Sequence, residues 1–325
     1  AAFLFKSLVG SYMSKRKGGE DWLEALEVGP STRRKLEELG VASPEHLLEF
    51  TVDELIDAGI EPQTAERILA KARELLGRRP RAVKASELLK AQFKVVKTGV
   101  AEFDEKVPWG GLREGFIYEF AGEFGAGKSM LAHQISVRSI AEGFGDVVYI
   151  DTEGTFNAGL AERIARRFGV DAAQALDKIS VYVPDNVSAL EAFAKYELPK
   201  HLKEGARTIV VDTITALYRA EFVGRENLAE RQQRLHYLID WFRRHARVFN
   251  ALVVFTNQVM DVPEAFLSGL KRPAGGNVLA HAVNARFMMT RPSKQKEEGH
   301  MWPLDVPGMA PDVRIQYRLA EDGVY

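Results

Sequence analysis

A glycine-rich segment between residues 122 and 129 carries the strongest chemical signal in this chain. It reads Gly122-Glu123-Phe124-Gly125-Ala126-Gly127-Lys128-Ser129 and satisfies the P-loop pattern G-x-x-x-x-G-K-[ST]. Glycines allow backbone N–H groups to surround phosphate oxygens, and a helix that follows adds its positive end. Lys128 is expected to bridge the β- and γ-phosphates of ATP, and Ser129 to bind Mg²⁺. Because an expected strand (116–121) precedes the segment and an expected helix (130–140) follows it, we predict an ATP site rather than a simple turn.

Two apolar stretches further along the chain end in carboxylates. Residues 209–212 read Ile-Val-Val-Asp, which places Asp212 at a strand end, where a carboxylate commonly binds the metal of a nucleotide site. Residues 149–156 read Tyr-Ile-Asp-Thr-Glu-Gly-Thr-Phe, so Glu153 lies just beyond another strand end. Hydrolysis of the γ-phosphate needs a group that orients and deprotonates water. We predict that Asp212 binds Mg²⁺ and that Glu153 is the catalytic base, the alternative for Glu153 being a solvated loop acid.

A third apolar stretch ends in Thr256-Asn257-Gln258. In open α/β sheets the carboxyl ends of the strands converge on the ligand. A neutral amide at such a place can hydrogen-bond the γ-phosphate and respond to its loss. Gln258 is therefore predicted to take part in catalysis, and a role in a turn or a helix cap is the alternative.

Bringing those side chains together requires a sheet whose strand ends meet at one edge. Short apolar or β-branched runs predict strands at residues 116–121, 147–151, 180–183, 208–212 and 252–256. Helical patterns lie between most of them, and this alternation favours a parallel sheet with helices on its faces. Residues 286–290 and 313–319 have no helix between them, which favours an antiparallel extension. The predicted fold class is α/β: a P-loop ATPase core with a mostly parallel central sheet over residues 98–325.

The residues before this core follow other patterns. Residues 1–20 end in a basic, glycine-bearing stretch and are expected to form a flexible arm. Residues 21–77 show short helical patterns separated by glycine turns, which predicts a small all-α domain. Residues 78–97 form a basic connector interrupted by Pro80.

Composition limits which functional classes fit this sequence. The 325 residues carry a formal net charge of −1, so a nucleic-acid surface must be a local patch. The chain has no cysteine, which excludes disulfides, thiolate metal ligands and cysteine catalysis and agrees with a reducing compartment. No apolar run approaches the roughly 18 residues of a membrane span. We therefore expect a cytoplasmic protein without a membrane partner.

Several segments together resemble the RadA-type archaeal and eukaryotic branch of the RecA recombinase family. They are residues 122–129, 151–156, 219–234, 256–260 and 273–281, which match the family in order and spacing. Residues 21–77, with Val28-Gly29-Pro30, resemble the family's helix-hairpin-helix DNA-binding domain. The resemblance runs from about residue 21 to the end of the chain. It implies a RecA-type core that uses ATP and Mg²⁺.

The resemblance also implies roles for individual residues. Glu153 resembles the catalytic base, and Gln258 resembles the residue that couples the γ-phosphate to a DNA-binding loop. The first DNA-binding loop is implied at Arg219, Arg225 and Arg231, and the second at residues 261–278, with Lys271, Arg272, Gly275, Gly276 and Asn277. His281 resembles a nucleotide sensor, and Asp305 and Pro307 resemble a cap over ATP held by the neighbouring subunit. Basic side chains beside a glycine turn suit phosphate contacts, although a charged loop is often merely solvated.

The chain departs from the family pattern at several places. Residues 157–160 are Asn-Ala-Gly-Leu where the family usually has Arg-Pro-Glu-Arg, whose last arginine helps to hold the adenine. The second loop and the cap region diverge in detail. In the connector, Ala82 occupies the place of the phenylalanine with which one subunit docks on the next.

These observations lead to a first expectation and to alternatives. We expect a DNA-dependent ATPase that forms ATP-bound filaments on single-stranded DNA and catalyses homologous pairing and strand exchange with double-stranded DNA. The alternative is a recombinase paralogue, a regulatory DNA-binding ATPase without strand exchange, which could act with a related recombinase. A ring motor of the hexameric helicase class shares the P-loop but not the pattern of residues 219–234.

Overall fold

The computed structural model describes residues 22–78, 82–224, 226–261, 271–293 and 295–325. The chain separates into two compact units, residues 1–93 and 94–325. The arm expected at residues 1–20 lies outside the described residues. The second unit starts a few residues before the expected boundary at 98, because β1 (Val95–Val96) pairs with β2 (Leu112–Arg113) within it.

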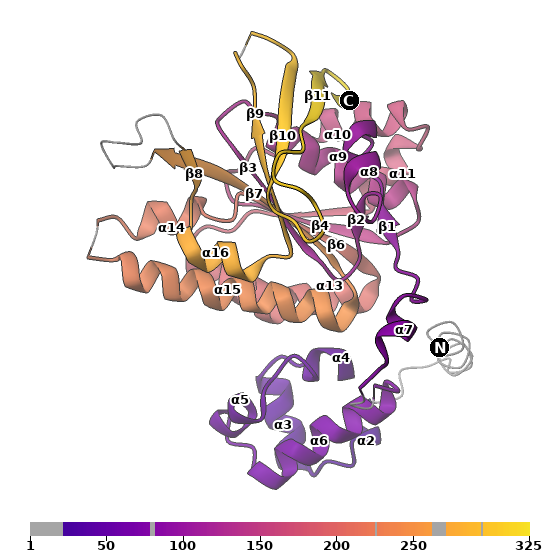
Figure 1. Cartoon of the computed structure of the whole chain (residues 1–325). Coiled ribbons are helices and arrows are strands. Elements are labelled where there is room, and N and C mark those ends of the chain that lie inside the picture. The colour runs from indigo at the N-terminus through magenta and orange to yellow at the C-terminus, as the bar shows by residue number, and fades with distance from the viewer. Residues whose placement is uncertain (1–21, 79–81, 225, 262–270, 294) are drawn as a thin grey trace. The chain divides into compact units, whose positions relative to one another are not determined.

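Every element of secondary structure described in the first unit is a helix (Figure 1). It contains α2 (Trp22–Ala25), α3 (Pro30–Glu38), α4 (Pro44–Leu47), α5 (Val52–Asp57), α6 (Pro62–Leu75) and α7 (Ala85–Leu88). Proline occupies the first turn of α3, α4 and α6, where its missing N–H costs no helical hydrogen bond. Thr51 and Glu54 form a capping box at the start of α5. Leu26, Leu36 and Leu47 are fully buried, so these short helices share one apolar core.

A large, mostly parallel sheet forms the centre of the second unit (Figure 1). The strand order is β12-β11-β10-β9-β3-β7-β6-β4-β5, and β8 pairs with the end of β7. The strands are β3 (Ile117–Gly122), β4 (Asp146–Asp151), β5 (Ile179–Tyr182), β6 (Ala206–Asp212), β7 (Leu252–Asp261), β8 (Lys271–Pro273), β9 (Ala285–Thr290), β10 (Glu298–Asp305), β11 (Ile315–Ala320) and β12 (Gly323–Val324). Pairing is parallel from β9 across to β5, and antiparallel from β9 to β12. The predicted α/β class with a mostly parallel sheet is confirmed.

Successive residues of the central strands β3, β4 and β6 point to opposite faces and nearly all are buried, as expected for a sheet with helices on both faces. The helices of the unit are α8 (Ala101–Lys106), α9 (Lys128–Ala141), α10 (Ala158–Arg167), α11 (Ala172–Asp177), α12 (Val187–Ala192), the π-helix η1 (Phe193–Glu197), α13 (Leu198–Glu204), α14 (Ala216–Glu221), α15 (Leu228–Phe249) and α16 (Gly276–Ala282). Tyr149 and Val210 belong to the core under α9 and α10. Phe255 instead meets Phe242 of α15, with ring centroids 5.3 Å apart.

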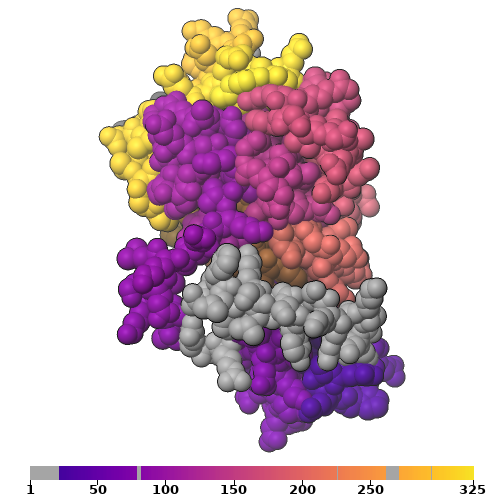
Figure 2. Space-filling model, turned by 90° about the vertical axis from the view of Figure 1, so that its right-hand side faces the viewer, coloured from indigo at the N-terminus to yellow at the C-terminus, as the bar shows by residue number. Residues whose placement is uncertain are grey.

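The carboxyl-terminal strands close one side of the unit. The predicted antiparallel extension is present, but β10 lies between the two strands that the sequence indicated and was not predicted. Its Gly299 and Pro303 interrupt the apolar alternation by which a strand is recognised. Figure 2 shows the C-terminal residues, in yellow, beside the purple and magenta segment, and α8 contacts β11 while α9 contacts β12. No helix among the described residues is long and apolar enough to cross a membrane.

Candidate nucleotide site and its connections

The P-loop connects the end of β3 to the start of α9, and its glycines are required by close packing. Gly127 has φ +96°, and a Cβ there would lie 2.6 Å from Leu319 Cδ2. A Cβ on Gly122 would lie 2.4 Å from the carbonyl oxygen of Met289. Both strands that crowd the loop, β9 and β11, therefore constrain its path. The loop leads directly into the N-terminus of a fourteen-residue helix, where N–H groups and the helix dipole favour an anion.

Lys128 is held inside the loop. Its Nζ donates to the carbonyl oxygens of Gly122 at 2.9 Å and Glu123 at 2.8 Å, and the residue is only 8% exposed. Burial lowers the pKa of Lys128, while the carboxylates of Asp212 and Glu153 act in the opposite direction. The ammonium group thus lies among carbonyls and carboxylates at the centre of the site.

Two side chains from the carboxyl-terminal strands bind the next carbonyls of the loop. Tyr317 Oη donates to the carbonyl oxygen of Ala126 at 2.6 Å, and Arg291 donates to that of Gly125 at 2.7 Å. Tyr317 is 3% exposed. The sequence patterns did not indicate either residue, because each lies far from the loop along the chain.

Ser129 and Asp212 meet where a metal ion would bind. Ser129 Oγ donates to Asp212 Oδ1 at 3.2 Å, Thr256 Oγ1 also donates to Oδ1, and Tyr149 Oη donates to Oδ2 at 2.7 Å. Asp212 is 3% exposed. A hydroxyl and a buried carboxylate side by side fit Mg²⁺, which prefers few protein oxygens together with phosphate oxygens. The residues present therefore suit the predicted ion.

Glu153 lies on a turn between β4 and α10. Asp151 closes this turn, because its carboxylate accepts from the N–H of Phe156 at 2.7 Å and from that of Glu153 at 3.3 Å. Burial raises the pKa of Glu153, and the nearby Asp212 raises it further. A carboxylate with a raised pKa next to a lysine is suited to accept a proton from water near neutral pH.

Gln258 connects Glu153 to a basic residue. Its Nε2 donates to Glu153 Oε1 at 3.0 Å, and its Oε1 accepts from Arg219 at 2.8 Å. Arg219 lies on α14, which leads into the segment that contains Arg225. The amide thus faces the candidate base with one end and a candidate DNA-binding side chain with the other.

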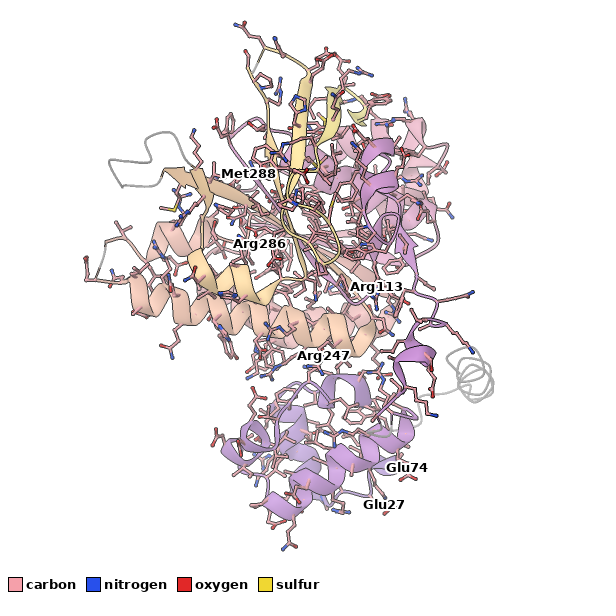
Figure 3. All side chains as sticks on the ribbon, in the orientation of Figure 1. Glu27, Glu74, Arg113, Arg247, Arg286 and Met288 are labelled. Carbon is pink, nitrogen blue, oxygen red and sulfur yellow. The ribbon has the colours of Figure 1, made fainter. Side chains whose placement is uncertain are left out.

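Asn257, the neighbour of Gln258, organises the same region from inside the core. It is fully buried and donates to Glu119 Oε1 and to the carbonyl oxygen of Ala274, both at 2.7 Å, while it accepts from Thr215 Oγ1 at 2.8 Å. Glu119 in turn pairs with Arg286 on β9, which is labelled in Figure 3. Asn257 therefore fixes the residues just before α14 and just before α16 to the central strands.

Some of the other predicted residues border the P-loop and Gln258, and the rest lie elsewhere in the second unit. Lys271, at the start of β8, pairs with Glu123 of the P-loop at 2.7 Å. A groove of about 570 Å³ lies between these parts, lined by Gly122, Glu123, Phe124, Arg219, Gln258, Val259, Met260 and Lys271. Arg272 is exposed, Gly275 and Gly276 begin α16 with positive φ, Asn277 and His281 are exposed on that helix, and Arg231 lies on α15. Arg225 lies outside the described residues.

The predicted ATP cap and sensor stand apart from the P-loop. Asp305 ends β10 and Pro307 follows it, and both are exposed. Within the described ranges, no side-chain hydrogen bond or ion pair joins Asp305, Pro307 or His281 to residues 122–129. Their assigned roles remain predictions about contacts with a second copy of the chain.

Comparison with known proteins gives the same family as the sequence motifs. The Rad51 family model matches residues 90–325, which is most of the chain. The chain belongs to the Rad51 family. It is 34% identical to the DNA repair and recombination protein RadA of Ignicoccus hospitalis, covering 97% of this chain and 98% of that protein. It is also 34% identical to the RadA proteins of Aeropyrum pernix, over 91% of this chain and 94% of the relative, and of Methanococcus voltae, over 91% and 96%.

Several side chains of this Rad51-family site were missed by sequence reasoning. Tyr149 and Thr256 bind Asp212, and Tyr317 and Arg291 bind the P-loop backbone. Tyr149 and Thr256 could have been found, because they belong to the same strand-end segments as the predicted site residues Glu153 and Gln258. The contacts of Tyr317 and Arg291 depend on how β9 and β11 fold back, which no local pattern reveals.

Proposed function

We propose that this Rad51-family chain is a DNA-dependent ATPase that assembles with ATP on single-stranded DNA and catalyses homologous pairing and strand exchange. The observation that carries the proposal is the hydrogen-bonded series Glu153–Gln258–Arg219. It provides a physical route between γ-phosphate chemistry and a basic segment. The RadA proteins to which the chain is similar are named for DNA repair and recombination.

In the proposed reaction the P-loop holds the triphosphate. Backbone N–H groups of residues 122–129 and the start of α9 bind phosphate oxygens, and Lys128 exchanges its carbonyl partners for the β- and γ-phosphates. Mg²⁺, held through Ser129 and Asp212, would neutralise part of the phosphate charge. Glu153 orients a water molecule in line with the γ-phosphate and accepts its proton.

In this proposal Gln258 couples the presence of the γ-phosphate to DNA binding. A γ-phosphate near Glu153 offers the amide a new acceptor, and any shift of Gln258 changes its bond to Arg219. Arg219, Arg231, Lys271 and Arg272 supply positive charge to the DNA backbone, which suits sequence-independent binding. The glycines Gly275, which is half-buried, and Gly276, which is exposed, allow close approach of that backbone.

Two features favour a second candidate, a regulatory paralogue without strand exchange. Residues 157–160 lack the arginine that the family resemblance leads one to expect at the adenine, and Ala82 replaces the docking phenylalanine. Ala82 and its neighbour Val83 are both exposed, so no large aromatic side chain is presented at that point of the connector. We infer that assembly depends on ATP and DNA more than is usual in the family.

Two measurements separate the candidates. A strand-exchange assay with homologous single- and double-stranded DNA distinguishes a recombinase from a paralogue. Light scattering of the protein alone should indicate a monomer or weak association at micromolar concentration, and ATP with single-stranded DNA should produce assemblies, visible as filaments by electron microscopy. Stable rings or filaments without nucleotide would contradict the assembly proposal.

A further inference from the structure

The position of the Glu153 carboxylate depends on the backbone of its turn. Within the described residues, that carboxylate receives one side-chain hydrogen bond, from Gln258. Much of the surface of this residue is exposed although its carboxylate is partly desolvated, so packing alone does not fix it. Whatever holds residues 151–157 in place therefore determines where the candidate base lies.

One side of this turn is attached to β6. The hydroxyl of Thr152 donates to the carbonyl oxygen of Thr213 at 2.8 Å and accepts from the N–H of Thr213 at the same distance. The N–H of Thr152 also donates to the carbonyl oxygen of Asp212 at 2.9 Å. These bonds fix the first half of the turn next to the carboxylate that is predicted to bind Mg²⁺.

His133 holds the other side. Its Nε2 accepts from the N–H of Asn157 at 3.0 Å, and its Nδ1 lies 2.7 Å from the carbonyl oxygen of Ser129. A carbonyl can only accept and an amide N–H can only donate, so both contacts together require a neutral ring with the proton on Nδ1. Burial lowers the pKa of His133, which agrees with the neutral form.

Ring stacking fixes the orientation of this imidazole. The Phe156 ring stacks on His133 with centroids 4.7 Å apart and planes 18° from parallel, and the Tyr149 ring packs against both. His133 is 3% exposed. The Nδ1 atom also lies 3.4 Å from Tyr149 Oη. These polar contacts and the stacking leave the ring one position, between the first turn of α9 and the end of the Glu153 turn.

We propose that His133 is a positioning residue for ATP hydrolysis. Its ring ties the loop turn that carries Glu153 to the first helical turn of α9, which carries Ser129. The inference rests on the proposed ATPase function and deepens it. Through His133 the catalytic base and the metal site keep a constant separation. Loss of the tether leaves phosphate binding intact but displaces the base, and small displacements of reacting groups slow reactions strongly.

The test compares two substitutions of this residue in the full chain. His133→Phe keeps a stacking ring and loses the polar contacts with Asn157, Ser129 and Tyr149, whereas His133→Gln keeps an acceptor near the position of Nε2. We expect His133→Phe to lower kcat about 10- to 100-fold with KM for ATP changed by less than about twofold. His133→Gln should restore kcat to within about threefold of the original. Ser136→Ala is the control, because within the described part of the chain Ser136 Oγ bonds inside α9, to the carbonyl oxygen of Ala132.

A double variant shows whether the effect passes through the base. If His133 acts by placing Glu153, His133→Phe should slow a Glu153→Gln protein no further. An unchanged kcat in His133→Phe, an effect confined to KM, or a Gln variant as slow as the Phe variant would overturn the proposal. Additive losses in the double variant would overturn it too.

Amide hydrogen exchange gives a readout that does not need activity. The Asn157 N–H should exchange at least about tenfold faster in His133→Phe than in the original chain or in His133→Gln, because its acceptor is lost. If the original chain hydrolyses no ATP, the proposed function fails, and the exchange measurement still decides whether the tether exists. If the Asn157 N–H exchanged at the same rate in the original chain, His133→Phe and His133→Gln, the proposed tether would be refuted.

Discussion

The amide of Gln258 donates to the carboxylate of Glu153 across 3.0 Å and so joins β7 to the turn that follows β4. These strands are not neighbours, because β6 lies between them in the sheet. The contact therefore needs both side chains to extend over the edge of the sheet. The same amide accepts from Arg219, so a change at either end can alter the other.

The first prediction concerns this coupling. Gln258→Ala removes the bridge but leaves Lys128, Ser129, Asp212 and Glu153 in place. We expect hydrolysis without DNA to stay within about fivefold of the original, while stimulation by single-stranded DNA is lost. Steady-state hydrolysis with and without DNA measures both. Gln316→Ala, an exposed glutamine on β11, is the matched control and should keep the stimulation. Full stimulation in Gln258→Ala would remove the residue from the coupling.

The second prediction concerns pH. Only the carboxylate form of Glu153 accepts a proton, so kcat should fall as pH falls through its pKa and level off above it. Burial and Asp212 raise that pKa above the ordinary value of glutamate, so the loss should begin at a higher pH than for an exposed carboxylate. Glu153→Gln should lower kcat about 100-fold or more, retain ATP binding and lack this acid limb. If the original chain and Glu153→Gln showed the same pH profile of kcat, the titrating group would be another residue.

Local patterns were sufficient for the P-loop and for the carboxylates at strand ends, because each of these depends on neighbouring residues along one strand or turn. The chemistry proposed for Ser129, Asp212 and Glu153 follows from that placement. Contacts such as Tyr317 with Ala126, or Asn257 with Ala274, depend on which strands become neighbours. The strand β10 was missed for a local reason, because Gly299 and Pro303 interrupt the apolar alternation by which a strand is recognised.

The third prediction concerns the P-loop carbonyl bound by Tyr317. Tyr317→Phe removes one buried hydroxyl and leaves the ring, and the lost hydrogen bond is worth about 1 kcal/mol. We expect KM for ATP to rise about fivefold, because the loop is less well ordered before it binds phosphate, with kcat little changed. Nucleotide titration by isothermal calorimetry checks the same effect on binding. Tyr237→Phe, at an exposed tyrosine of α15, is the control, and equal affinity in both variants would contradict the role of Tyr317.

The fourth prediction concerns stability of the core. Glu119 is fully buried and pairs with Arg286, so Arg286→Met should leave an uncompensated carboxylate and cost about 3–5 kcal/mol. Replacing both by Leu and Met should recover much of this loss. Arg166→Met breaks the exposed pair with Glu162 and should cost less than about 1 kcal/mol. Urea denaturation followed by tryptophan fluorescence gives the comparison, and equal losses in the two single variants would refute the assignment.

The proposed function depends on ATP hydrolysis at this P-loop that responds to DNA. The most direct measurement is the steady-state rate of phosphate release with saturating ATP and Mg²⁺, with and without single-stranded DNA, for the original chain and for Lys128→Ala. We expect DNA to raise the rate of the original chain at least about tenfold, and Lys128→Ala to abolish hydrolysis under both conditions. A rate that DNA leaves unchanged, or hydrolysis that survives in Lys128→Ala, would contradict the account.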